Sequence, residues 1–154
     1  MSIYFAGAIR GGRDDKALYL EIIELLSEYG RVLTEHIGDS RLTALGETAG
    51  DKEIHDRDLS WLKEAKYVVA EVTVPSLGVG YEIGKATEWG KPVLCLFRPS
   101  DGRALSAMIA GSGGITVREY RNTVELKSAF DQFFRGMSRQ RLDPHPRSDF
   151  KGDI

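Results

Sequence analysis

Short apolar, β-branched runs alternate with helical patterns along most of this 154-residue chain. The patterns predict strands at residues 3–6, 31–35, 67–73, 92–97 and 115–120. They predict helices at 14–29, 51–65, 81–89 and 104–110, and a last helix that starts at Asn122 and ends at Gly136. Alternation of this kind is typical of βαβ units, in which crossover helices join parallel strands. The sequence therefore predicts an α/β fold around a parallel sheet.

The chain length suits one domain. After Gly136 the sequence becomes polar and contains Pro144 and Pro146. We predict one folded domain over residues 1–136 and a polar, disordered tail over residues 137–154.

Composition excludes several classes of protein. Twenty-one basic residues stand against 23 acidic ones, a net charge of −2, which argues against a protein that coats nucleic acid. No apolar stretch approaches the roughly 20 residues of a membrane helix, and the N-terminus has no secretory pattern. The single cysteine, Cys95, lies in an apolar run and is expected to be a plain core thiol. We expect a soluble intracellular protein.

Ligands of parallel sheets bind outside the carboxyl ends of the strands, so the loops at 7–13, 36–50, 74–80 and 98–106 are candidates. The first loop combines glycines, from Gly7 to Gly12, with Arg10 and Arg13. Such a loop can bring backbone N–H groups and guanidinium groups to a phosphate. The alternative is a flexible turn with two solvated arginines. His36, at the carboxyl end of the second strand, could contact a ligand; the alternative is a structural or solvent-facing histidine.

The third loop contains Ser76, Gly78 and Gly80 and leads into the predicted helix at 81–89. Glu82 is expected in the first turn of that helix, where the helix dipole favours a carboxylate and lowers its pKa. An ionised carboxylate at this edge could act as a nucleophile. The alternative is a glutamate that only stabilises its helix.

Asp58 occupies the position missing from the apolar stripe of the predicted helix at 51–65. The spacing points this carboxylate inward, whereas its neighbours Asp56 and Arg57 are expected to face elsewhere. A buried carboxylate at a cleft suits acid–base chemistry. The alternatives are a buried salt bridge to a distant arginine or a cap to a loop.

Glu71, Tyr4 and the histidines are also considered as site residues. Glu71, within the third strand, is interpreted as structural. Tyr4 on the first strand needs a partner for its hydroxyl, and Glu82 would serve, although it could also be an ordinary core tyrosine. The histidines at 36, 55 and 145 show no metal-ligand spacing, so no metal is predicted.

Two carboxyl groups are the equipment for cleaving a glycosidic bond, because one stabilises an oxocarbenium-like transition state while the other protonates the leaving group. A phosphate-binding loop would add a phosphorylated substrate. A nucleotide is the obvious member of that class.

Several motifs in this order resemble the family of 2′-deoxynucleoside 5′-phosphate N-hydrolases, relatives of the bacterial nucleoside 2-deoxyribosyltransferases. The motifs are YFAGAIRGGR (4–13), VLTEH (32–36), IHDRDL (54–59), VAEVTVPSLGVGYE (69–82), LCLFRP (94–99) and LSAMI (105–109). The resemblance implies a doubly wound, five-stranded Rossmann or flavodoxin-like fold and a homodimer in the cytoplasm and nucleus. We expect no cofactor, and the charge balance and hydropathy predict no nucleic-acid or membrane partner.

The resemblance also implies roles for individual residues. It implies hydrolysis of 2′-deoxynucleoside 5′-monophosphates, such as 5-hydroxymethyl-dUMP, through a glycosyl-enzyme intermediate. Glu82 matches the nucleophile, Asp58 the second catalytic carboxyl group and Tyr4 the residue that orients Glu82. The matched or expected substrate contacts are Gly7, Ile9, Arg10, Gly11, His36, Ser76, Gly78 and, from the neighbouring subunit, Ser106. Ala8 departs from the serine of related proteins, which removes one hydroxyl.

Two other functions stay open on the sequence alone. One is a base-exchanging deoxyribosyltransferase or a ribonucleotide hydrolase on the same scaffold. The other is a nucleotide sensor without turnover, against which the paired Asp58 and Glu82 argue.

Overall fold

The computed structural model describes residues 1–8, 12–34, 50–100 and 102–140. Residues 12–14 and 138–140 are described by their helical backbone alone. Five strands form one parallel sheet in the order β2-β1-β3-β4-β5. They are β1 (Ser2–Ala6), β2 (Arg31–Leu33), β3 (Tyr67–Glu71), β4 (Val93–Phe97) and β5 (Ile115–Glu119). The predicted doubly wound α/β fold is confirmed.

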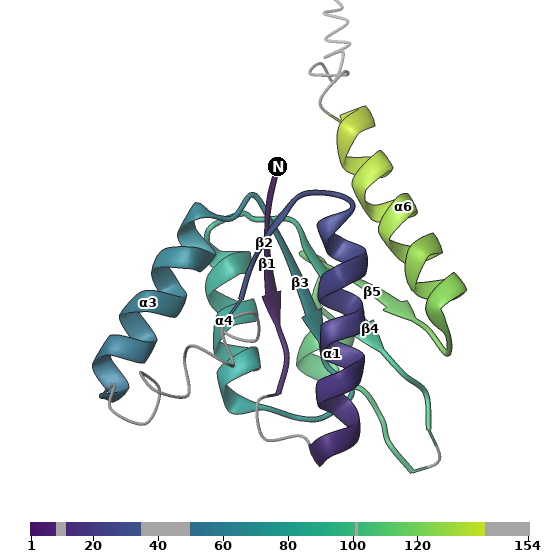
Figure 1. The fold of residues 1–154 in the computed structure, drawn as a ribbon, viewed down its shortest axis with the longest axis horizontal. Coiled ribbons are helices and arrows are strands. Elements are labelled where there is room, and N and C mark those ends of the chain that lie inside the picture. Colours follow the sequence, from purple (N-terminus) through teal and green to yellow (C-terminus); the bar gives the residue numbers. More distant parts are fainter. Residues whose placement is uncertain (9–11, 35–49, 101, 141–154) are drawn as a thin grey trace, which may run out of the picture.

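Helices cover both faces of the sheet (Figure 1). They are α1 (Gly12–Ser27), α3 (Asp51–Glu64), α4 (Leu77–Glu88), α5 (Ala107–Ala110) and α6 (Thr123–Gln140). α1 and α6 pack on one face, and α3 and α4 pack on the other. The molecule is therefore a three-layer sandwich of helices, sheet and helices, as parallel sheets require.

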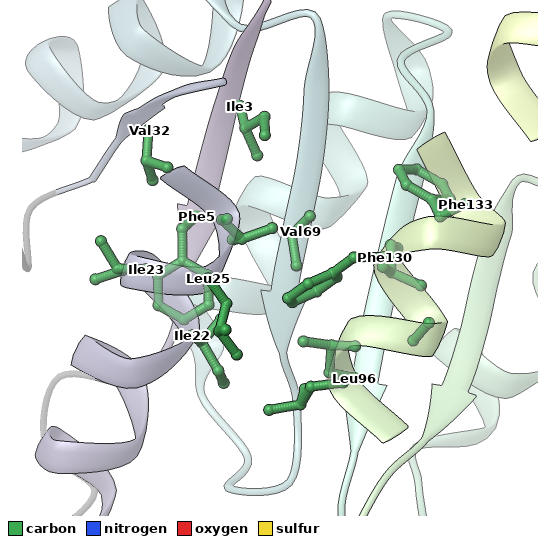
Figure 2. Packing of buried hydrophobic residues seen from close by; sticks show 14 of the residues in the cluster. Ile3, Phe5, Ile22, Ile23, Leu25, Val32, Val69, Leu96, Phe130 and Phe133 are labelled. Carbon is green, nitrogen blue, oxygen red and sulfur yellow. The ribbon is translucent and has the colours of Figure 1, made fainter. Parts of the chain in front are cut away.

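Side chains alternate between the two faces along each strand. On β1, Ile3 and Phe5 join the core under α1 and α6, whereas Tyr4 and Ala6 join the core under α3 and α4. Figure 2 shows Ile22 of α1 and Phe130 of α6 converging over Val69 and Leu96 of the sheet. The register pairs Tyr4 with Val68, so Tyr4 and its neighbours on β3 and β4 share the second face.

Cys95 lies on that second face, in the middle of β4, and is fully buried. Burial raises the pKa of its thiol to about 12. The expected core thiol is confirmed.

The helix ends differ from the sequence predictions by up to four residues, most of all at the start of α4 and at the end of α6; α5 begins three residues later than predicted. α4 begins at Leu77 rather than at Tyr81, because the Ser76 side chain accepts a hydrogen bond from the Val79 N–H and caps the helix. α6 continues beyond Gly136 to Gln140, because one exposed glycine lowers helix stability without ending the helix. At the other end of α6, the Glu125 N–H donates to Asn122 Oδ1 at 2.9 Å, so Asn122 caps the helix. Residues 141–154 of the predicted tail lie outside the described residues.

Candidate active site

The candidate site lies where the path of the chain reverses between two neighbouring strands. β1 leads into α1 on one face of the sheet, and β3 leads towards α4 on the other. Adjacent parallel strands whose connections diverge in this way leave a crevice outside their carboxyl ends, which is where α/β proteins bind ligands. α1 and α4 both begin at this edge, so their unpaired N–H groups are available there for an anion.

Glu82 and Tyr4 form the centre of the site. The Tyr4 hydroxyl donates a hydrogen bond of 2.6 Å to Glu82 Oε1. Tyr4 is fixed on β1 and only 1% exposed, while Glu82 is partly buried. The predicted partnership of these two side chains is confirmed.

The electrostatics of Glu82 differ from the sequence expectation. Because α4 begins four residues earlier than predicted, Glu82 lies in its second turn, and the helix dipole acts mainly on the first. Burial raises the pKa of Glu82 to about 7, the bond from Tyr4 opposes this rise, and the charge of Asp58 adds to it. The predicted lowering of this pKa is therefore wrong, and a proton is held on Glu82 up to neutral pH.

Asp58 points into the protein from α3, as its spacing predicts, and is only 8% exposed. Its charge acts on Glu82, so the two carboxyl groups share one region of the protein. The prediction that Arg57 faces elsewhere is wrong. The Arg57 Nε and Nη2 atoms each lie 2.9 Å from Asp58 Oδ1.

The Ser76 and Gly78 positions lie at the start of α4. The Ser76 hydroxyl oxygen already accepts the Val79 N–H at 3.4 Å, and its own proton can be donated to a ligand. Gly78 is exposed in the first turn, where its N–H has no carbonyl partner within the helix. Both positions therefore offer donors to an anion.

The remaining predicted contacts are only partly described. Gly7 follows β1, and a Cβ atom at this position would lie 3.2 Å from the Tyr19 ring, which explains the glycine by packing alone. Ser106 precedes α5 and is exposed. Ile9, Arg10, Gly11 and His36 lie outside the described residues.

Sequence reasoning missed one bridge beside the two carboxyl groups. His55 Nε2 lies 3.1 Å from the Tyr81 hydroxyl, which joins α3 to α4. His55 is three residues before Asp58 on α3, but its contact with Tyr81 depends on how α3 packs against α4, and no spacing along the chain shows that packing. Within the described residues, no group of three or more His, Cys, Asp or Glu side chains could hold a metal ion, and no helix is long and apolar enough to cross a membrane.

The sequence and fold resemble proteins of nucleoside and nucleotide chemistry. The sequence model of the nucleoside 2-deoxyribosyltransferase family matches residues 3–126. The chain is 54% identical over 138 residues to the 5-hydroxymethyl-dUMP N-hydrolase of Rattus norvegicus, covering 86% of this chain and 84% of the relative. It is 50% identical over 145 residues to the protein of the same name from Esox lucius, covering 90% and 99%.

Solved structures agree with the fold. The CMP N-glycosidase of Clostridium botulinum superposes with a TM-score of 0.60 at 18% identity, over 86% of this chain and 100% of that one. At this identity the likeness concerns the arrangement of strands and helices.

Proposed function

This chain belongs to the nucleoside 2-deoxyribosyltransferase family, and we propose that it is a hydrolase of the N-glycosidic bond in 2′-deoxynucleoside 5′-monophosphates. The products are the free base and 2-deoxyribose 5-phosphate. The names of the N-hydrolase relatives support water as the acceptor, and 5-hydroxymethyl-dUMP is the first substrate to test.

The observation that carries this proposal is the Tyr4–Glu82 hydrogen bond in a site that Asp58 also faces. In the first step, a Glu82 carboxylate oxygen bonds to C1′ of the sugar while the bond from C1′ to the base nitrogen breaks. Asp58 gives its proton to the departing base. In the second step, water attacks C1′, Asp58 takes a proton from that water, and the ester to Glu82 breaks.

The resting site holds a proton where the scheme needs a negative charge. Burial and the nearby charge of Asp58 raise the pKa of Glu82 to about 7, so Glu82 is protonated below that pH. Attack on C1′ needs the ionised form of Glu82, so Glu82 must release this proton before the first step.

Donors for the 5′-phosphate are concentrated at the carboxyl edge of the sheet. The start of α4, with Ser76 and Gly78, supplies backbone and hydroxyl donors, and the helix dipole there favours an anion. We assign the Gly7–Gly11 loop, with Arg10, to the same phosphate. Hydrogen bonds to a charged group contribute about 1.5–3 kcal/mol each, so the phosphate is a large part of substrate affinity.

The active form is a homodimer in which Ser106 reaches the phosphate of the neighbouring subunit. Support comes from the exposure of Ser106 and of the apolar side chain beside it, Met108, which is 83% exposed. Leu77, at the start of α4, is 97% exposed and adds apolar surface close to the same site. Sedimentation across a range of concentrations tests the dimer, and a monomer at working concentration would contradict it.

A nucleotide panel tests the proposed activity. The protein is incubated with 5-hydroxymethyl-dUMP, dCMP, dGMP, CMP and the bare nucleoside 5-hydroxymethyldeoxyuridine, with a chelator present, and free base is measured by chromatography. We expect base from one or more deoxynucleoside monophosphates and much less from CMP or the bare nucleoside. Adding a second free base distinguishes the transferase, because only a transferase forms a new nucleotide with it.

A further inference from the structure

Arg57 lies beside a proposed catalytic group yet has no assigned role. Neighbouring residues on a helix point in different directions and do not normally face each other. Arg57 nevertheless folds along α3, so that its Nε and Nη2 atoms each approach Asp58 Oδ1 to 2.9 Å. This two-atom approach to a single oxygen needs the planar guanidinium group and is beyond a lysine.

The fold holds the Arg57 side chain in this position. Its guanidinium carbon lies 4.9 Å from the centre of the Trp61 ring, one turn further along α3. A cation over an aromatic face is attracted by the ring, and the ring also shields one side of the guanidinium group from water. The Arg57 and Asp58 side chains are 27% and 12% exposed. Solvent therefore screens this pair much less than an ordinary surface pair.

Another arginine–carboxylate pair of the same protein provides the contrast. Arg31 Nη1 lies 3.1 Å from Glu64 Oε1, with side chains 71% and 50% exposed. Exposed pairs of that kind contribute little. The Arg57–Asp58 pair has two contacts, both shorter, and the charge of Asp58 acts on Glu82.

We propose that Arg57 is a positioning residue of this site, which fixes the orientation of the Asp58 carboxyl group through Oδ1. Oδ2 is then the oxygen left for the leaving base and for water, since the described residues place no other hydrogen bond on Asp58. Arg57 acts only through Asp58. This inference rests on the proposed hydrolase function.

The first test is a double-mutant cycle with Arg57→Gln and Asp58→Asn, with Arg57→Lys as the conservative variant and Arg31→Gln as the control. We expect Arg57→Gln to lower kcat roughly ten- to a hundredfold, the value of a charge-assisted hydrogen bond, with KM changed less than about threefold. Arg57→Lys should fall between the wild type and Arg57→Gln. Arg31→Gln should match the wild type.

The Asp58→Asn background decides whether Arg57 acts through Asp58. There, Arg57→Gln should lower the remaining rate by less than about twofold, because its partner is already gone. An equal loss in both backgrounds, or a kcat of Arg57→Gln equal to that of Arg31→Gln, would overturn the proposal. Circular dichroism and thermal unfolding identify any variant that loses activity by unfolding.

A second readout needs no turnover and separates this inference from the proposed function. Carbon-13 NMR of the Glu82 carboxyl group follows its protonation with pH. Among the described residues, the titratable groups that act on Glu82 are Tyr4 from β1 and Asp58 from α3. Removal of the Arg57 charge makes the surroundings more negative, so the midpoint should move to higher pH in Arg57→Gln. If no nucleotide is cleaved, the hydrolase proposal fails. Whether or not turnover is seen, a Glu82 titration midpoint that is the same in Arg57→Gln and in the wild type would refute the role of Arg57.

Discussion

Two glutamates lie on opposite faces of the same sheet, and each accepts a hydrogen bond from a tyrosine hydroxyl. Glu82 receives Tyr4 at 2.6 Å on the face covered by α3 and α4. Glu71 is fully buried on the other face and receives Tyr120 at 3.0 Å. Apart from the tyrosine, the groups around Glu82 and the groups around Glu71 are different. This difference explains why the Glu82 cluster is suited to catalysis and the Glu71 cluster to a structural role.

The partners of Glu71 are either positively charged or neutral hydrogen-bond donors. The Thr73 N–H donates to it at 3.3 Å, the Thr73 hydroxyl donates as well, and Arg98 Nε lies 3.6 Å away. Arg98 also donates to Asp15 at 2.7 Å, which ties the first turns of α1 to the carboxyl ends of β3 and β4. Burial still raises the pKa of Glu71, but four contacts stabilise its charged form.

Among the described residues, Glu82 accepts one hydrogen bond, from Tyr4, and has a like charge nearby. Its pKa near 7 results from burial and from Asp58, and Tyr4 alone opposes the rise. A carboxyl group that is incompletely compensated stays reactive, whereas a fully partnered one is inert. The glutamates thus differ through their neighbours rather than through their own chemistry.

The largest expected effect is the loss of turnover in Glu82→Gln. We expect kcat to fall at least about a thousandfold, because removal of a nucleophile abolishes the covalent step while the fold is retained. Glu88→Gln is the matched control, since Glu88 lies on the same helix in an exposed pair with Lys85. Rates are compared under saturating substrate, and a Glu82→Gln rate near that of Glu88→Gln would contradict the assignment.

The opposite result is expected for Glu71→Gln. In this variant Arg98 loses its buried charged partner, and the new amide N–H₂ group faces the hydrogen-bond donors of Thr73 and Tyr120. The free energy of unfolding should therefore fall by about 2–4 kcal/mol. The kcat of the folded fraction should change less than about threefold. Urea unfolding and turnover at low temperature measure the two quantities. If Glu71→Gln is as stable as the wild type but inactive, the distinction between the two clusters is wrong.

These expectations show how far the sequence alone leads. The alternation of strands and helices along the chain and the gap in the apolar stripe at Asp58 are both local sequence patterns, so both could be predicted. The start of α4 was not, because Gly78 and Gly80 resemble a loop and only the Ser76 cap makes them helical. Arg57 was missed because helical geometry normally separates neighbouring side chains, whereas here its guanidinium group lies over the Trp61 ring and contacts Asp58.

The Glu71 cluster could not be predicted as a set, although its structural role was. Its members come from β3, from the residues after β4 and β5, and from α1. No spacing along the chain brings Tyr120 within 3.0 Å of Glu71, because that contact depends on the order of strands in the sheet.

A smaller effect concerns the pH dependence of stability. The folded protein holds the Glu82 proton up to a pH near 7, whereas the unfolded chain releases it near 4.5. This contribution to stability is therefore complete below pH 4.5 and is lost as the pH rises through 7. We expect the wild type to lose on the order of 2 kcal/mol relative to Glu82→Gln across this interval. Parallel unfolding curves at pH 5 and pH 8 measure it, and a constant difference between the two proteins would contradict the raised pKa.

The smallest effect is expected for Tyr4→Phe. Loss of this hydrogen bond raises the pKa of Glu82 further, because the bond stabilises the charged form. We expect kcat at neutral pH to fall roughly tenfold, as for loss of one hydrogen bond to a charged group. Tyr120→Phe is the matched control on the other face, and it should lower stability without changing kcat. Equal effects of the two substitutions on kcat would remove the contrast between the faces.

Because Cys95 is buried in the sheet, its reaction with a thiol reagent can report unfolding of the protein. Its thiol lies in the central part of the sheet with no exposure, and burial raises its pKa to about 12. In the folded state, a thiol reagent therefore cannot reach the sulfur, and the reactive thiolate is not formed. Labelling requires the separation of β4 from its neighbours, which is close to global unfolding. Since the chain has a single cysteine, the labelling rate counts the molecules that open, in any of the variants above and in the presence of any nucleotide.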